Sequence, residues 1–233
     1  MKKIGMLGGM SWESTAKYYE QVNIGIREKL GGLHSAKIAM VSLDFEEIDR
    51  LQRDGDWISA TEVLTKAALE LQNNGSDFLL ICTNTMHKIY DEIQARLSIP
   101  VLHIADSTGQ ALETAGYKKV GLLGTKFTME EDFYKSRLLE NFNIEALVPS
   151  PARRDEGHRI IYEELCRGRL LAESRQTYLQ IIKNLKDSGA EAIILGCTEI
   201  PLLISQNDTE MPIFDTTTLH AAHAVELATT EQL

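Results

Sequence analysis

The sequence has no apolar run that approaches the roughly 20 residues needed to span a membrane. Its first residues also lack the apolar core of a signal peptide, because a short strand pattern ends at the glycine pair Gly8 and Gly9. Basic residues are few: 24 lysines and arginines stand against 34 acidic residues, which gives a net charge of −10. That charge argues against a binding surface for nucleic acid or anionic membranes. We therefore expect neither as a partner.

Groups that hold metals or cofactors are also scarce. The three cysteines, Cys82, Cys166 and Cys197, do not have metal-ligand spacing, and neither do the six histidines. No lysine stands where a Schiff base to pyridoxal phosphate is expected, and the Gly8-Gly9 turn is not the dinucleotide fingerprint. Three cysteines cannot all pair with each other, which is typical of reduced thiols. These absences favour a cytoplasmic protein.

What the chain does contain is a duplication. Residues 71–85 (LQNNGSDFLLICTNT) align without a gap with residues 185–199 (LKDSGAEAIILGCTE), 114 positions further on. Segments that begin at Lys2 and Ile99 repeat at offsets of 116 and 112 positions. A nearly constant separation of this length predicts two homologous halves rather than a short-period solenoid.

The hydrophobic pattern predicts an α/β fold for both halves. The expected strands lie at 3–8, 37–43, 78–82, 100–103, 119–123, 144–148, 192–196 and 212–214. The expected helices include 12–29, 57–74, 129–141, 156–167 and 172–188. Alternating strands and helices imply parallel sheets, whose ligands bind beyond the carboxyl ends of the strands.

We therefore expect two pseudo-symmetric, Rossmann-like domains, each with a mainly parallel sheet flanked by helices. The first comprises residues 1–103 and is joined by a C-terminal helix at about 212–233, and the second comprises residues 104–211. An active site is expected in the cleft between them, with polar groups delivered from both strand ends. Such a site suits a reaction that must reach both faces of one carbon.

Cys197 is the strongest candidate for a reactive group. It lies in the motif Leu-Gly-Cys-Thr-Glu, where a strand ends and a helix is expected to begin. Backbone N–H groups and the positive end of a helix dipole lower the pKa of a thiol from about 8.5 towards neutrality, and such a thiol can act as a base. The alternative is a buried, inert cysteine, which the duplicated context and the polar residues that follow disfavour.

The corresponding segment of the first half ends in Cys82, Thr83, Asn84 and Thr85. The alignment sets Thr83 opposite Cys197. Because side chains alternate along a strand, Cys82 is then expected to be a core residue. Asn84 and Thr85 can bind a carboxylate through amide, hydroxyl and backbone donors, although the same residues are also typical helix caps.

The turn that follows the first strand contains Met10 and Ser11, and the equivalent turn of the second half contains Thr128. A glycine-rich turn with a serine cap explains the first pattern without any ligand. Thr128 is a candidate contact from the second half. His87 and His103 also follow strands, but a lone histidine is more often a structural hydrogen-bonding residue than a catalyst.

These motifs resemble those of the aspartate/glutamate racemase family over essentially the whole chain. Its members are similar in having two pseudo-symmetric α/β domains, a Cys-Asn-Thr motif in one, and Gly-Cys-Thr-Glu in the other. The run Cys-Thr-Asn-Thr-Met-His at 82–87 is most similar to the bacterial L-aspartate/glutamate-specific, broad-specificity amino-acid racemases. The resemblance implies an isomerase without cofactor or metal, in which one residue removes the α-proton and its counterpart returns one on the opposite face.

By motif position, the resemblance assigns proton transfer to Thr83 and Cys197. The residues that it assigns to amino-acid binding are Met10, Gln52, Asn84, Thr85, Thr128 and Thr198. A homodimer is the assembly that it suggests. A hydroxyl at Thr83 replaces the family's usual thiol and is a much poorer base. We therefore expect faster reaction from the enantiomer that Cys197 deprotonates.

Two other functions are open at this point. A decarboxylase of malonate-type acids, in the same superfamily, resembles a racemase that has kept only its second-half cysteine. A non-catalytic amino-acid-binding module is the other alternative. For a racemase, aspartate, glutamate and neutral amino acids such as homoserine are all candidate substrates.

Overall fold

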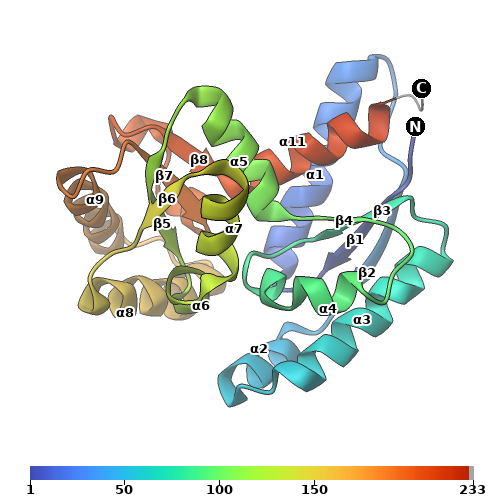
Figure 1. The fold of residues 1–233 in the computed structure, drawn as a ribbon, viewed down its shortest axis with the longest axis horizontal. Helices are drawn as coiled ribbons and strands as arrows, with labels where there is room; N and C mark the ends of the chain where they lie inside the picture. Colours follow the sequence, from blue (N-terminus) through green and yellow to red (C-terminus); the bar gives the residue numbers. More distant parts are fainter. Residues whose placement is uncertain (231–233) are drawn as a thin grey trace. The chain divides into compact units, whose positions relative to one another are not determined.

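The computed structural model describes residues 1–230 and divides into two compact units (Figure 1). The first unit contains Met1–His103 and the chain from His220 onward, and the second contains Ile104–Leu219. Residues 231–233, which end the expected C-terminal helix, lie outside the described residues. The chain therefore passes from one unit to the other twice.

The first unit is built on a parallel sheet with strand order β2-β1-β3-β4. Its strands are β1 (Ile4–Gly8), β2 (Ile38–Ser42), β3 (Phe78–Ile81) and β4 (Val101–Leu102). Its helices are α1 (Trp12–Leu30), α2 (Phe45–Asp54), α3 (Trp57–Asn73), α4 (Tyr90–Gln94), most of α11 (Thr216–Thr229), and a 3-10 helix over Thr85–Ile89. Parallel neighbours require such crossover connections, which is why strands and helices alternate along the sequence.

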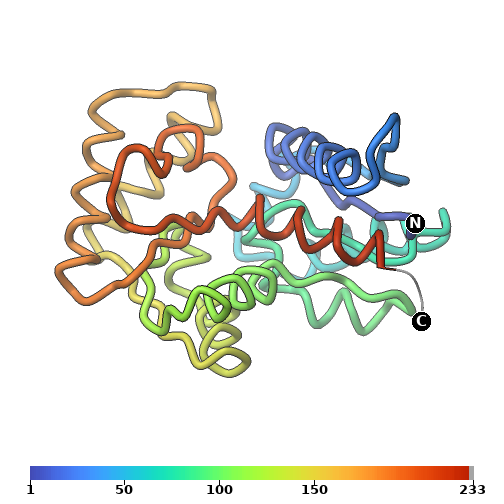
Figure 2. Tube along the Cα trace, turned by 90° about the horizontal axis from the view of Figure 1, so that it is seen from above, coloured from blue at the N-terminus to red at the C-terminus, as the bar shows by residue number. Residues whose placement is uncertain are grey.

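Both faces of this sheet are covered by helices, so its strands are apolar throughout. Leu79 and Ile81 face a cluster built with α2, α3 and α4. Met6 and Leu80 face the opposite cluster, where α1 and α11 pack. Figure 2 shows these two helices, blue and red, next to each other. In the structure, α11 therefore packs on the first unit.

The second unit repeats this architecture with strand order β6-β5-β7-β8, all parallel. Its strands are β5 (Lys119–Gly124), β6 (Glu145–Leu147), β7 (Ala192–Gly196) and β8 (Ile213–Asp215). Its helices are α5 (Ile104–Ala115), α6 (Lys126–Glu130), α7 (Asp132–Phe142), α8 (Pro151–Arg159), α9 (Ala172–Asp187) and α10 (Ile200–Leu203). A π-helical turn (Ile160–Glu164) and 3-10 turns (Leu165–Arg167 and Gln206–Asp208) complete it.

The two sheets correspond strand by strand. Leu7 pairs with Ile81 in the first, and Leu123 pairs with Leu195 in the second, at the offsets of 116 and 114 positions found in the sequence. Leu123 and Leu195 pack with α9, while the other face of the second sheet packs with α5 and α7. This repetition confirms the predicted fold of two pseudo-symmetric α/β halves.

The eight predicted strands are all present, with ends that differ by at most one residue. The helices differ more. The helix predicted at 129–141 is divided into α6 and α7 because Glu131 has extended backbone, with ψ at 158°. The helix predicted at 156–167 begins earlier, with Pro151 at its first turn, and ends at Gly168, whose φ of 70° is left-handed.

The boundary expected at about 212 also differs from the structure. β8 belongs to the second sheet, where Ile213 pairs with Ile193, so the chain returns to the first unit only at His220. Among residues 1–230, no helix has the length and apolar character needed to cross a bilayer.

Candidate active site

Three candidate residues lie in the loop that follows β3. Thr83 is half-buried, and its backbone carbonyl accepts a hydrogen bond from His87 Nδ1 at 2.9 Å. Asn84 and Thr85 are 3% and 5% exposed and lead into the 3-10 helix. Because this loop stands at the carboxyl end of a parallel strand, it occupies the edge where ligands bind in open α/β sheets.

Cys82 belongs to the core of the first unit. It is fully buried in the cluster formed with α1 and α11, and its backbone N–H donates to the carbonyl of Leu7 at 2.9 Å. Burial raises the pKa of its thiol far above the usual value. The prediction that Cys82 is a core residue is confirmed.

Met10 and Gln52 approach the same loop from the end of β1 and from α2. Met10 is 3% exposed and shares a hydrophobic cluster with Met86. Gln52, which is 4% exposed, donates from Nε2 to Met86 Sδ at 3.1 Å. Met86 directly follows Thr85, so both side chains pack around the candidate loop of the first unit.

The turns that follow β1 and β5 share one hydrogen-bonded construction. Ser14 N–H donates to Ser11 Oγ at 3.3 Å, and Thr128 N–H donates to Thr125 Oγ1 at 3.3 Å. Thr128 therefore corresponds to Ser14. Its buried side chain lies against Gly196, since a Cβ there would stand 3.3 Å from Thr128 Cγ2. This contact brings Thr128 next to the residue that precedes the candidate cysteine.

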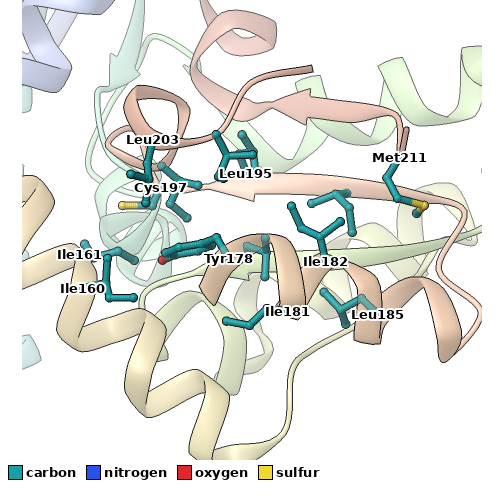
Figure 3. Close-up of a cluster of buried hydrophobic side chains, with 14 of the residues drawn as sticks. Ile160, Ile161, Tyr178, Ile181, Ile182, Leu185, Leu195, Cys197, Leu203 and Met211 are labelled. Atoms are coloured by element: carbon teal, nitrogen blue, oxygen red, sulfur yellow. The ribbon is translucent and has the colours of Figure 1, made fainter. Parts of the chain in front are cut away.

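Cys197 directly follows β7 in a hydrophobic cluster that includes Tyr178 and Leu195 (Figure 3). Its side chain is 7% exposed, and its Sγ donates to Glu199 Oε2 at 2.9 Å. Thr198 Oγ1 donates to the same carboxylate oxygen at 2.7 Å. Cys197 is thus buried, as the inert alternative requires, yet it is bonded to a carboxylate that is itself only 6% exposed.

The expectation of a low thiol pKa at this position is wrong. Burial and then the negative charge of Glu199 raise the pKa of Cys197 well above its usual value. The helix expected to favour a thiolate is α10, which begins only at Ile200 and has four residues. A dipole that short does not offset burial and a carboxylate. At neutral pH Cys197 is therefore a thiol.

Glu199 is the residue that sequence interpretation did not assign. Its signal was present, because it ends the second copy of the repeated segment and stands opposite Thr85 of the first. However, an acidic residue at the start of a helix often has only a structural role, because it interacts favourably with the positive end of the helix dipole. Only the folded chain shows that its carboxylate turns back onto the thiol of Cys197.

Comparisons with known proteins agree with the fold and the motifs. Residues 7–224 match the model of the Asp/Glu/Hydantoin racemase family. The broad specificity amino-acid racemase RacX of Bacillus subtilis is 25% identical over 237 positions, covering 95% of this chain and 96% of RacX. The crystal structure of an Asp/Glu racemase candidate from Yersinia pestis is similar with a TM-score of 0.93 and 48% identity, covering 99% of this chain and 100% of that one. An aspartate racemase homologue from Pyrococcus horikoshii has a TM-score of 0.86 and 35% identity, with the same coverage. Because the family match spans most of the chain, this protein belongs to the Asp/Glu/Hydantoin racemase family and is an isomerase of the racemase class.

Proposed function

We propose that the protein racemises an amino acid of the aspartate or glutamate type without a cofactor. Cys197 and Thr83 transfer protons to and from opposite faces of the α-carbon. The observation that carries the proposal is the 2.9 Å hydrogen bond from Cys197 Sγ to Glu199 Oε2, because it gives a buried thiol a base that can take its proton. Family membership and the equivalence of the two strand ends support Thr83 as the second group.

Cys197 starts the reaction as a thiol. Its proton passes to Glu199 along the existing hydrogen bond, which leaves a thiolate and a neutral carboxylic acid. The transfer moves one negative charge from oxygen to sulfur and adds no net charge to a buried site, so it avoids the cost of burying a new ion. The thiolate then takes the α-proton, and the electrons of the Cα–H bond remain on the substrate as a carbanion.

Thr83 gives its hydroxyl proton to the other face of that carbanion. It then takes a proton from solvent, and Glu199 gives its extra proton to solvent, so both groups return to their starting forms. A hydroxyl is a far weaker acid than a thiol, so we expect the proton transfer from Thr83 to be the slower step.

Enantiomers have equal free energies, and kcat/KM must therefore be equal in both directions. The faster reaction expected from the enantiomer that Cys197 deprotonates is thus a difference in kcat at saturating substrate. The difference between the two enantiomers should also appear in isotope exchange. The α-proton that faces Cys197 is removed, exchanges with solvent through the Cys197–Glu199 pair, and is replaced by a solvent proton on the same face more often than the carbon is inverted.

Chiral chromatography of L-aspartate, L-glutamate and L-homoserine after incubation with the protein tests the proposal. We expect the D-enantiomer of an acidic amino acid to form, and we expect Cys197→Ser to slow its formation at least about 100-fold because the proton-transfer group is lost. A disubstituted malonate is assayed in parallel for carbon dioxide release. Carbon dioxide without any D-amino acid would identify a lyase, and failure to invert any of the amino acids would refute the racemase.

A further inference from the structure

Three buried histidines of the first unit form a cluster, and one of them contacts the loop at Thr83 that follows β3. His87, His103 and His220 are at most 3% exposed. The ring of His87 is 4.7 Å from that of His103 and 5.8 Å from that of His220, measured between centroids. Tyr90 stacks on His87 with its ring centre 6.5 Å away. The sequence pattern favours plain structural histidines at His87 and His103, but His87 also contacts the Thr83 backbone.

The hydrogen bonds of this cluster fix which ring nitrogens carry protons. A carbonyl oxygen only accepts, so His87 Nδ1 must donate to the Thr83 carbonyl, 2.9 Å away. By the same reasoning His220 Nε2 donates to the Leu102 carbonyl at 3.0 Å. Its Nδ1 then accepts from Tyr18 Oη at 2.9 Å when the ring is neutral. His220 is thereby held from both sides, and its ring packs against His87.

The second unit shows which part of this arrangement belongs to the fold alone. There, Tyr134 Oη donates to Thr108 Oγ1 at 3.1 Å, and these residues occupy the positions of Tyr18 and His220. Each unit thus has a tyrosine hydrogen-bonded to the helix that follows the last strand of the other unit's sheet: α11 in the first unit and α5 in the second. The contact from His87 is different, because the equivalent position in the second unit is a proline that has no side-chain donor.

The equivalent strand ends of the two units therefore have different polar neighbours. Cys197 is bonded through its side chain to a carboxylate, whereas Thr83 is held through its backbone by an imidazole. At the position of Glu199 the first unit has Thr85. The imidazole contact accompanies the one catalytic candidate that is not a thiol.

We propose that His87 is a positioning residue for the Thr83 side of the racemisation. Its hydrogen bond fixes the peptide plane that follows Thr83, and this plane sets the direction of the Thr83 side chain. The packed ring of His220 keeps the His87 imidazole in place. Because proton transfer depends steeply on geometry, a loop shift of about 1 Å is enough to slow one face of the reaction about 100-fold. The inference rests on the proposed racemase function.

The test compares His87→Leu with His87→Asn in deuterium oxide. Asparagine places a side-chain N–H near the position of Nδ1 and can still donate to the Thr83 carbonyl, whereas leucine cannot. Both enantiomers of the amino acid that the wild type racemises are incubated with each variant. Mass spectrometry after chiral separation gives two rates: inversion, and deuterium uptake with retention of configuration. The exposed His34 supplies the control variant His34→Asn, which should match the wild type.

We expect His87→Leu to slow inversion about tenfold or more through the lost hydrogen bond and the displaced Thr83. Deuterium uptake with retention, which Cys197 performs from the other face, should persist, so the ratio of uptake to inversion rises. His87→Asn should restore inversion to within about threefold of the wild type. A general loss of structure would lower both rates together and leave their ratio unchanged.

An unchanged ratio in His87→Leu, or a failure of asparagine to restore inversion, overturns the role of His87. If the wild type neither inverts nor exchanges any amino acid tested, the proposed function itself fails, and the inference fails with it. The two failures are distinguished by the wild-type measurement alone.

Discussion

At Cys197, burial and a neighbouring carboxylate act on the thiol in the same direction, and both raise its pKa. A cysteine with a raised pKa is usually inert, because the thiolate is the reactive form. The hydrogen bond to Glu199 changes that conclusion, since the same carboxylate that disfavours the thiolate can accept the proton when the substrate arrives. The reactivity of this residue therefore depends on a pair of groups rather than on the cysteine alone.

Glu199→Gln separates these two effects of the carboxylate. Glutamine keeps an oxygen that accepts from Cys197 but cannot take its proton, so we expect kcat to fall about 100-fold. Removing the negative charge should at the same time lower the thiol pKa, and Cys197 should react faster with iodoacetamide at pH 8. Racemisation rates and alkylation rates of the two proteins provide the measurement.

The opposite result would be informative. If Glu199 acted solely by suppressing the thiolate, Glu199→Gln would be more active than the wild type. Activity at or above the wild-type level would therefore remove Glu199 as the proton acceptor. Glu210, an exposed acidic residue paired with Lys186, offers the control Glu210→Gln, which should leave both rates unchanged.

At the scale of elements, the strands were predictable and the site chemistry was less so. Apolar runs and turn residues determine where a buried strand begins and ends, so the register of Thr83 against Cys197 could be read from the repeat. The helix interruption at Glu131 and the π-helical turn at Ile160–Glu164 depend on tertiary packing, which a local pattern does not contain. The direction of the Glu199 side chain depends on it as well.

Gly196 shows how closely the strand ends of the second unit are packed. A Cβ at this position would stand 2.9 Å from the Leu123 carbonyl oxygen and 3.1 Å from Leu122 Cδ1. Because the first of these atoms belongs to the backbone of β5, Gly196→Ala should push the end of β7 outward. We expect a loss of about 1–3 kcal/mol in the free energy of unfolding. We also expect a lower kcat, since Cys197 is the next residue.

Urea unfolding and racemisation assays measure these two effects. Gly157→Ala in α8 is the matched control, because a Cβ there comes no closer than 3.5 Å to Tyr178 Oη. Alanine in a helix interior should raise stability by up to about 1 kcal/mol. Equal stability changes for the two substitutions would show that the strand ends are not tightly packed.

At the scale of the whole molecule, duplication produced two units with one topology and different polar interiors. The first unit contains the buried histidines, and the second contains the buried thiol–carboxylate pair. Burial lowers the pKa of His220 well below its usual value, and the neighbouring His87 and His223 lower it further. The hydrogen bond to the Leu102 carbonyl opposes this shift but does not reverse it.

This shift predicts how stability depends on pH. The folded protein keeps His220 neutral, while the unfolded chain binds a proton below a pKa of about 6.5, so stability is present above that pH and is lost as the pH falls below it. Between pH 7.5 and 5.5 His220 should account for up to about 1.4 kcal/mol of the loss. The rings of His87 and Tyr18 pack against His220, and His223 lies close enough to lower its pKa. None of these three is an acidic partner for a charged ring.

His220→Gln isolates this contribution. Glutamine can still donate to the Leu102 carbonyl but does not titrate, so the variant should lose less stability than the wild type over this pH range. Urea unfolding at the two pH values gives the difference. Equal losses for the two proteins would contradict a neutral, buried His220.

The position of deuterium in the first product molecules tests whether two groups act on opposite faces of the substrate. The protein is incubated in deuterium oxide with one protiated enantiomer, and the opposite enantiomer is isolated within the first turnovers for mass spectrometry. With Cys197 on one face and Thr83 on the other, nearly every product molecule should carry deuterium at Cα, because the returning proton comes from a group that has exchanged with solvent. Product that retains the proton of its substrate would show that one group serves both faces.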